Sequence, residues 1–387
     1  MMQKTPKVLI FSLTYLPFIG GAEVAVSEIT KKIAGIEFDI ITCNLDGCQQ
    51  AVEQKDNIKI YRVGHGKNSK RFFPWLAYKK ALELHRLNNY SLIWSIMANR
   101  AGLAALFFKR KFSDVKFLLT LQEGDSLFSI WKKTWYFRPI YKKIYTRADH
   151  IQAISQWLAR RARSYGYKKD ISVVPNGVDL DKFKTQNSKL KTKEELSIKP
   201  EDKIILTDSR LVVKNGVADL IKSVHILVTH YPLLTPKLVI LGSGPLEKQL
   251  KQFALRLGVT DKIIFLGRVP HEQIQDYYQI ADIFVRPSLT EGFGNVFVQA
   301  MAASLPVIAT PVGGILDFFK DSETGWFCEV KNPQSIAEKI NYILEEKNKD
   351  EVERVVANAR HMVEEKYDWN LIADKMKNIF DSIMHNS

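Results

Sequence analysis

The strongest constraint on the fold is a repeated alternation of short apolar segments with longer helical ones along most of the chain. Buried strands of a parallel sheet read as continuous apolar runs, since helices cover both of their faces. The sequence therefore predicts an α/β protein with two doubly wound parallel sheets. The expected strands of the first series are 7–13, 37–43, 58–63, 91–96, 115–120, 150–155 and 171–175, and those of the second are 203–209, 237–242, 262–267, 282–287, 306–310 and 325–330.

A polar, Lys-rich segment at residues 176–202 separates the two series and is the expected hinge. A chain of 387 residues is long enough for two or three domains, each with its own core. We therefore expect one Rossmann-like domain at 1–180, a second at 181–364 and a terminal segment at 365–387 that contains an amphipathic helix.

The composition is that of an ordinary globular protein, with 46% hydrophobic and 25% charged residues. The longest apolar stretches are too short to span a bilayer. The first of them contains Pro17 and a pair of glycines, which fit a strand and loop better than a signal peptide. Three cysteines cannot all pair, and neither they nor the eight histidines have a metal-ligand spacing. We expect a protein of the reducing cytoplasm that binds no metal.

The charge is distributed unevenly along the chain. Residues 1–180 hold 29 Lys and Arg against 14 Asp and Glu, a net charge of +15, whereas the remainder has a net charge of −1. The excess is interleaved with aromatic residues at 70–82, 106–112 and 131–147. Basic residues mixed with aromatic ones suit an anionic membrane surface. Two other interpretations stay open: solvated helix faces over an aromatic core, and a nucleic-acid surface.

The segment 286–314 combines a strand end, a glycine-containing loop, a helix and the next strand. At the carboxyl ends of parallel strands such a loop lines the ligand crevice, and the helix that opens near Asn295 offers its free amides to an anion. Phosphate is the expected ligand. Glu291 adds a carboxylate that can accept hydrogen bonds from sugar hydroxyls, and Gln299 lies two turns further along.

This segment resembles the donor-binding motif of the retaining glycosyltransferases of family four (glycosyl transferases group one), which have the two-domain GT-B fold. The family pattern is Glu, seven residues, Glu; Glu291 fills the first position, and Gln299 stands at the second. The resemblance implies that Glu291 lies near the donor sugar and that position 299 binds the ribose. The donor-binding candidates of this segment are Gly292, Phe293, Gly294, Asn295, Val296 and Gln299.

Further motifs extend the resemblance over nearly the whole chain. Gly20 and Gly21 stand where the family has its first glycine loop, and Arg210 and Lys214 stand where an Arg and a Lys clamp the donor diphosphate. The family usually places Lys directly before Gly, whereas this chain has Asn215 there.

A second departure lies in the first domain. Where the family commonly has a histidine after a strand, this chain has Gln122, which can contact a sugar hydroxyl but cannot act as an acid or base near neutral pH. Beside it, Glu123 and Asp125 face acceptor hydroxyls or cap a loop, and the sequence does not decide between the two.

The resemblance implies a retaining, metal-independent transfer of a sugar from a UDP- or GDP-sugar to an acceptor hydroxyl across an interdomain cleft. Glu291, Arg210 and Lys214 are the catalytic candidates, with no cofactor beyond the nucleotide sugar. The basic first domain favours a lipid-linked or membrane-proximal acceptor at the inner face of the cytoplasmic membrane, and no nucleic acid. The alternatives are a non-catalytic GT-B partner or scaffold protein and, with less support, a sugar-nucleotide epimerase.

Overall fold

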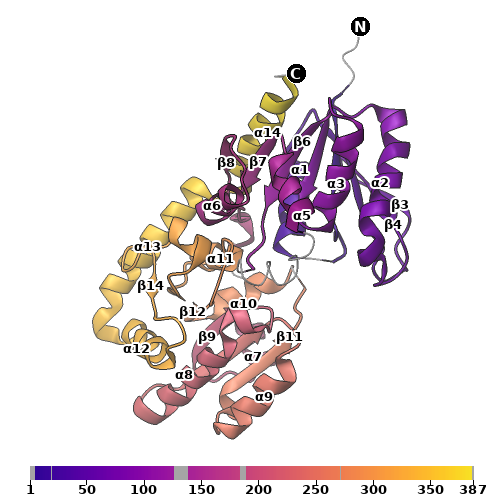
Figure 1. Cartoon of the computed structure of the whole chain (residues 1–387). Helices are drawn as coiled ribbons and strands as arrows, with labels where there is room; N and C mark the ends of the chain where they lie inside the picture. The colour runs from indigo at the N-terminus through magenta and orange to yellow at the C-terminus, as the bar shows by residue number, and fades with distance from the viewer. Residues whose placement is uncertain (1–4, 19, 126–137, 184–188, 271, 386–387) are drawn as a thin grey trace. The chain divides into compact units, whose positions relative to one another are not determined.

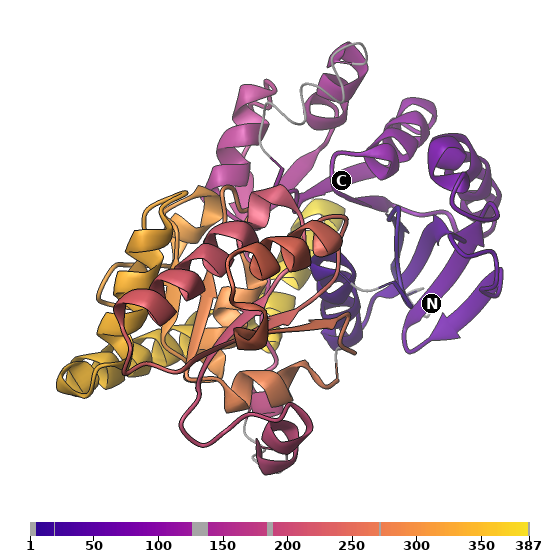
Figure 2. The same cartoon turned by 90° about the horizontal axis from the view of Figure 1, so that it is seen from below.

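The computed structural model describes residues 5–18, 20–125, 138–183, 189–270 and 272–385. Its contacts divide the chain into two compact units (Figures 1 and 2). Unit 1 comprises Met1–Asn176 with Trp369–Ser387, and unit 2 comprises Gly177–Asp368.

Unit 1 is built on an eight-stranded sheet in the order β3-β4-β2-β1-β5-β6-β7-β8. Every neighbouring pair is parallel except β3 with β4. The prediction of a wholly parallel sheet was wrong at this edge, because β3 is a short, mostly exposed and largely polar strand that lacks the apolar signature of a buried one. The strands are β1 (Lys7–Phe11), β2 (Glu37–Cys43), β3 (Val52–Lys55), β4 (Ile58–Val63), β5 (Leu92–Ile96), β6 (Lys116–Leu121), β7 (His150–Ala153) and β8 (Ile171–Val173).

Helices cover both faces of this sheet, as the apolar strands require. Val8 and Ile10 of β1 belong to a core shared with α1 and the last helix of the chain, whereas Phe11 packs its ring 6.2 Å from that of Phe108 on α3. The described helices are α1 (Gly21–Lys32), α2 (Ser69–Asn88), α3 (Arg100–Lys111), α5 (Arg138–Thr146), α6 (Gln156–Ser164) and the terminal α14 (Trp369–His385).

The end of the chain returns to unit 1. In both overall views α14, in yellow, lies beside α1, in indigo (Figures 1 and 2). Phe380 of α14 is fully buried, with its ring 5.1 Å from Trp94 and 6.0 Å from Phe38. Just before α14, the amide of Val178 donates to the carbonyl of Tyr367, so the outgoing and returning segments are paired at the start of unit 2.

Unit 2 is built on a six-stranded parallel sheet in the order β11-β10-β9-β12-β13-β14. Numbered from its own first strand, this is the 3-2-1-4-5-6 order of a dinucleotide-binding fold. The α/β class with two doubly wound domains is thereby confirmed. The strands are β9 (Lys203–Asp208), β10 (Pro236–Leu241), β11 (Ile263–Gly267), β12 (Ile283–Arg286), β13 (Val307–Ala309) and β14 (Trp326–Phe327).

The helices of unit 2 connect these strands and end in a long C-terminal pair. The longer ones are α7 (Lys189–Glu195), α8 (Val217–His230), α9 (Glu247–Arg256), α10 (Ile274–Ile280), α11 (Asn295–Ala302), α12 (Pro333–Leu344) and α13 (Lys349–Lys366). The short helical turns of the chain are η2 (Asp181–Phe183), η3 (Val213–Asn215), η4 (Thr260–Lys262), η5 (Gly313–Asp317) and η6 (Glu346–Asn348). Across the described parts of both units, no helix combines the length and the apolar character needed to cross a bilayer.

Candidate functional site

The strand order of unit 2 reverses between β9 and β12, which are hydrogen-bonded neighbours. Ligands of open α/β sheets bind outside the carboxyl ends of the strands at such a point. The loop 209–216 leaves β9 there, and the loop 287–294 leaves β12. These loops contain Arg210, Lys214 and Glu291, the three residues predicted to be catalytic.

The two loops are in direct backbone contact. The amide of Leu289 donates to the carbonyl of Lys214 at 2.7 Å. Gly216 has a φ of +69°, and a Cβ added to it would lie 1.9 Å from the carbonyl oxygen of Pro287. Only glycine tolerates both this left-handed conformation and this approach, so Gly216 fixes how closely the loops pack.

The backbone of Glu291 is held by the loop that follows β13. Gly314 donates its amide to the Glu291 carbonyl at 3.0 Å, and a Cβ on Gly313 would lie 1.9 Å from the same oxygen. Beyond Glu291 the chain turns at Gly294, which is the N-cap of α11 with a φ of +101°. The start of α11 therefore opens directly next to the carboxylate.

The side chain of Glu291 is held within its own loop and by the end of β12. One carboxylate oxygen, Oε1, accepts from the amide of Gly292 at 3.0 Å. The other, Oε2, lies 3.0 Å from Nη2 of Arg286 in an ion pair whose side chains are 13% and 12% exposed. A charge pair this sheltered from water is screened much less than one on the surface.

Arg286 also connects Glu291 to the loop that carries the predicted diphosphate clamp. Its Nη2 donates to Oδ1 of Asn215 at 3.1 Å, and Nδ2 of Asn215 donates to the carbonyl of Arg210 at 2.7 Å. The sequence indicates no role for Arg286, because a strand-end arginine carries no motif of its own, and it shows Asn215 only as a departure from the family pattern. Asn215 is 2% exposed, whereas Lys214 is half-buried and Arg210 exposed.

A half-buried acid lies at the end of β9, directly before the loop 209–216. Burial raises the pKa of Asp208, the last residue of β9, from its usual 3.8 to about 6, while the positive charge of Arg286 opposes the rise and Tyr278 hydrogen-bonds the carboxyl. The sequence interpretation passed over Asp208 as a strand residue. The ends of β9 and β12 thus hold Asp208, Arg286 and Glu291 in one electrostatic group.

The remaining candidates of this segment differ in exposure. Asn295, Val296 and Gln299 are half-buried on α11. The side chain of Phe293 is 2% exposed and packs its ring 5.0 Å from Phe318 and 5.7 Å from Tyr367. Phe293 can therefore contact a ligand only through its backbone.

The other candidates lie at the carboxyl edge of the unit 1 sheet. Gly20 is the N-cap of α1 and Gly21 its first residue, after the loop that leaves β1. Thr14 donates to the carboxylate of Glu23, whose pKa is raised by burial. Gln122 follows β6, and the glycine pair follows β1. Because β5 lies between these two strands in the sheet, Gln122 and the glycine pair do not follow adjacent strands.

Gln122 and Glu123 are engaged within unit 1. Oε1 of Gln122 accepts from Nδ2 of Asn176 at 3.3 Å. The carboxylate of Glu123 accepts from the amides of Ala98 and Gln122, and the carbonyl of Glu123 accepts from the buried guanidinium of Arg161. Burial raises the pKa of Glu123. Of the two readings left open for Glu123, the contacts favour the loop cap.

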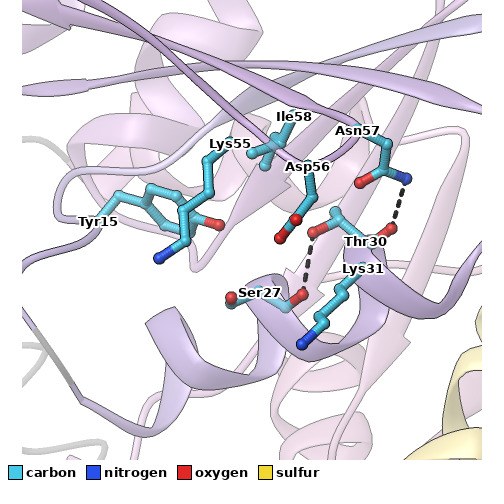
Figure 3. A pocket seen from close by; sticks show the side chains of 8 residues that line it. All are labelled: Tyr15, Ser27, Thr30, Lys31, Lys55, Asp56, Asn57 and Ile58. Atoms are coloured by element: carbon cyan, nitrogen blue, oxygen red, sulfur yellow. Dashed lines mark hydrogen bonds between the residues drawn. The ribbon is translucent and has the colours of Figure 1, made fainter.

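A small pocket of unit 1 contains none of the predicted site residues. It lies between α1 and the turn from β3 to β4, and Figure 3 shows its lining of Tyr15, Ser27, Thr30, Lys31, Lys55, Asp56, Asn57 and Ile58. Nδ2 of Asn57 donates to the carbonyl of Thr30, which ties the turn to the helix. Burial raises the pKa of Tyr15 to about 12, so its hydroxyl stays neutral.

The chain offers no cluster of metal-ligating side chains within the residues that the structure describes. Its three cysteines, Cys43, Cys48 and Cys328, are free. The predicted site residues form two sets: Gly20, Gly21 and Gln122 in unit 1, and all others in unit 2. A joint site across the two units remains a prediction.

Two family models match the chain. Residues 19–182 match Glycosyltransferase Family 4, and residues 188–362 match Glycosyl transferases group 1. An uncharacterized glycosyltransferase of Methanocaldococcus jannaschii is 33% identical over 55% of this chain and 54% of its own length. A GDP-mannose-dependent monoacylated alpha-(1-6)-phosphatidylinositol monomannoside mannosyltransferase of Corynebacterium glutamicum is 31% identical over 63% of this chain and 65% of its own. These matches thus span between half and two thirds of the two relatives.

Solved structures share the fold over the whole chain. The sucrose-phosphate synthase of Thermosynechococcus elongatus superposes with a TM-score of 0.85 at 20% identity, over 99% of this chain and 100% of that one. The Anabaena protein HepE, solved in complex with UDP-glucose, superposes with a TM-score of 0.81 at 18% identity, over 97% of this chain and 99% of that one. At these identities the likeness establishes the architecture of the molecule and leaves its substrates open.

Proposed function

Because the chain belongs to the glycosyltransferases of family 4, we propose that it moves a sugar from a nucleotide diphosphate sugar to an acceptor hydroxyl, retaining the anomeric configuration and using no metal. One observation carries the proposal. At the switch point of unit 2, the loop with Arg210 and Lys214 and the loop with Glu291 are joined by backbone and side-chain hydrogen bonds beside the start of α11.

These groups suit a leaving diphosphate. Arg210 and Lys214 supply two positive charges, and the amides at the start of α11 add a third source of positive potential. Charge that develops on the departing nucleotide is then neutralised by the protein, which is the role a divalent cation plays elsewhere. The leaving phosphate accepts the proton of the acceptor hydroxyl as the new bond forms on the same face of the sugar.

Glu291 orients the donor sugar in this scheme. Its carboxylate is fixed by Gly292 and Arg286, so it is held in one position before the substrate arrives. A preorganised acceptor of hydrogen bonds favours one sugar pose over others. Gly20, Gly21 and Gln122 of unit 1 are proposed as further donor-binding residues.

A panel of UDP- and GDP-sugars tests the proposal. We expect one of them to raise the unfolding temperature and to be consumed with release of the nucleotide diphosphate, at a rate that a chelator leaves unchanged. Arg210→Ala should abolish most turnover and leave the fold intact, and Arg256→Ala on the exposed face of α9 is the matched control. A wild-type protein that binds and consumes no nucleotide sugar would contradict the proposal and favour the non-catalytic alternative.

A finer part of the proposal concerns the acceptor, which we place at an anionic membrane surface. Phe72 and Trp75 on α2 are 56% and 59% exposed. The ring of Phe107 on α3 lies 6.2 Å from those of Trp75 and Tyr78, so three rings are in contact. Together with the exposed Phe72, three residues before Trp75 on the same helix, we call them the α2–α3 aromatic patch. Exposed Lys70, Arg71 and Lys79 lie along the same helix.

The chemistry of this patch fits the headgroup region of a lipid bilayer. Aromatic rings lie at headgroup level, and nearby lysines and arginines are attracted by anionic lipid. A protein bound to the membrane would reach a lipid-linked acceptor by diffusion within the plane of the bilayer. Residues 131–137 of the third basic-aromatic segment lie outside the described residues, whereas α5, within the same segment, exposes Ile140 next to Lys142 and Lys143.

Vesicle sedimentation tests the membrane contact. The protein should bind vesicles rich in phosphatidylglycerol at low salt, bind neutral phosphatidylcholine vesicles weakly, and be released at high salt. The double variant Phe72→Ala/Trp75→Ala should lose binding, and Leu233→Ala/Leu255→Ala, which removes exposed apolar side chains of unit 2, should not. Duplex DNA that is bound more tightly than the anionic vesicles at the same salt would support the nucleic-acid alternative instead.

A further inference from the structure

We infer that Arg286 is a positioning residue for transfer: its guanidinium holds the carboxylate of Glu291 and the loop of Arg210 and Lys214 in one arrangement. The inference rests on the proposed function, since it assigns a task within the same site. The observation behind it is that a single nitrogen, Nη2, lies 3.0 Å from Oε2 of Glu291 and donates to Oδ1 of Asn215 at 3.1 Å.

The contacts of Arg286 reach the backbone of the clamp. Asn215 receives the hydrogen bond from Arg286 on its oxygen and donates from its nitrogen to the carbonyl of Arg210 at 2.7 Å. Both the oxygen and the nitrogen of the Asn215 side chain are thereby engaged inside the protein. A movement of Arg286 would therefore shift both Glu291 and the loop that begins at Arg210.

The surroundings of Arg286 hold it in place. Its guanidinium carbon lies 6.0 Å from the ring centre of Phe297 on α11. Its positive charge also acts on the Asp208 carboxyl, whose pKa it lowers. It is thus bounded by β9, α11 and both loops. A planar guanidinium that forms an ion pair with Glu291 and a hydrogen bond to Asn215 is preorganised in a way that a lysine ammonium is not.

Stability alone does not account for this arginine. Its Nε is buried and has no hydrogen-bond partner, so part of its desolvation is not compensated. Buried ion pairs often contribute little net stability compared with apolar side chains of similar volume. We therefore expect that replacing Arg286 affects turnover more than it affects folding.

The test compares Arg286→Met and Arg286→Lys in the wild-type and Glu291→Gln backgrounds, with Arg256→Met as the control for loss of an arginine. Turnover is measured on the nucleotide sugar that the wild-type protein consumes, binding of UDP and of GDP by calorimetry, and folding by thermal unfolding. Arg286→Met should lower kcat at least about tenfold and change the Kd of the bound nucleotide less than about threefold. Arg286→Lys should recover part of the lost kcat.

The Glu291→Gln background separates positioning from a general structural effect. If Arg286 acts through Glu291, adding Arg286→Met to Glu291→Gln should lower the residual turnover by less than about twofold, because coupled residues are not additive. A decrease as large as in the wild-type background would overturn the inference. So would a kcat of Arg286→Met that equals that of the wild type.

Two other outcomes also decide the question. If Arg286→Met does not fold, Arg286→Lys replaces it, and an Arg286→Lys variant with wild-type kcat overturns the inference. If the wild-type protein consumes no nucleotide sugar and binds neither UDP nor GDP, the proposed function fails and the inference falls with it. An active wild-type protein with unaffected Arg286 variants removes the inference alone.

Discussion

Two side chains in unit 2 depart from the family pattern, and the structure treats them differently. Asn215, where a lysine is usual, is buried and bonded to Arg286 and to the carbonyl of Arg210. Gln299, where a glutamate is usual, is half-buried on α11. The first departure is part of the internal structure of unit 2, whereas contact between Gln299 and the ribose stays a prediction.

Gln299→Glu should tighten nucleotide binding. A charge-assisted hydrogen bond to a ribose hydroxyl is stronger than a neutral one by about 1–2 kcal/mol, which corresponds to about tenfold in Kd. Calorimetry with UDP and GDP measures the change, and Gln252→Glu on the exposed face of α9 controls for added negative charge. An unchanged Kd would mean that position 299 does not touch the ribose.

Gly216→Ala should disrupt the contact between the two loops. The added Cβ would lie 1.9 Å from the carbonyl oxygen of Pro287, a backbone atom that cannot move aside as a flexible side chain could. We expect a loss of at least about 2 kcal/mol in unfolding free energy together with loss of turnover. Denaturant unfolding measures the first, and Gly258→Ala, whose Cβ would meet open space at a similar φ, is the control for backbone strain alone.

At the scale of elements, the adjacent ends of β9 and β12 bring three ionisable side chains together next to the loops 209–216 and 287–294. The alternation of apolar runs predicts both strands, but it does not predict that they are neighbours, because the chain passes through β10 and β11 between them. Only the pairing places Asp208 near Arg286. The consequence is a carboxyl whose pKa is raised by its partial burial.

Stability should depend on pH through Asp208. Its pKa is higher in the folded protein than in the unfolded chain, so its contribution to stability is present at low pH and is lost as the pH rises from 3.8 through about 6. Asp208→Asn removes this dependence. Between about pH 4 and pH 8, the unfolding free energy of Asp208→Asn should gain about 2 kcal/mol relative to the wild type. Parallel curves for the two proteins would contradict the assignment.

The terminal helix α14 completes the core of unit 1. Phe380 is fully buried between Phe38 and Trp94. Truncating a buried phenylalanine to alanine costs about 3–5 kcal/mol through lost burial and the remaining cavity. Phe380→Ala should therefore lower the unfolding free energy by that amount in denaturant, whereas Leu371→Ala, at an exposed position of the same helix, should lower it little.

At the scale of the whole molecule, charge and candidate chemistry divide between the two units. The excess of positive charge and the α2–α3 aromatic patch lie in unit 1, and Glu291, Arg210 and Lys214 lie in unit 2. That unit 1 binds the acceptor and unit 2 the donor stays a prediction. The effect of a nucleotide can therefore be measured separately in unit 1 and in unit 2.

Hydrogen exchange should show the division directly. Adding UDP or GDP to the intact protein should slow amide exchange in the loops 209–216 and 287–294 and at the start of α11. The pocket between α1 and the β3–β4 turn in unit 1 contains no predicted site residue and should show no change. Protection confined to that pocket would place the nucleotide elsewhere and contradict the site.

The sequence by itself determined the class of fold, the two units and the loops that carry the candidate residues. It could do so because buried strands, glycine turns and helix starts are local patterns with local physical causes. It missed β3, whose polar residues give no burial signal, and the tasks of Arg286, Asn215 and Asp208. The contacts of these three side chains form only when β9 pairs with β12 and the loops that follow the two strands pack closely at Gly216. Contacts between residues so far apart in the chain depend on the tertiary structure and leave no local sequence pattern.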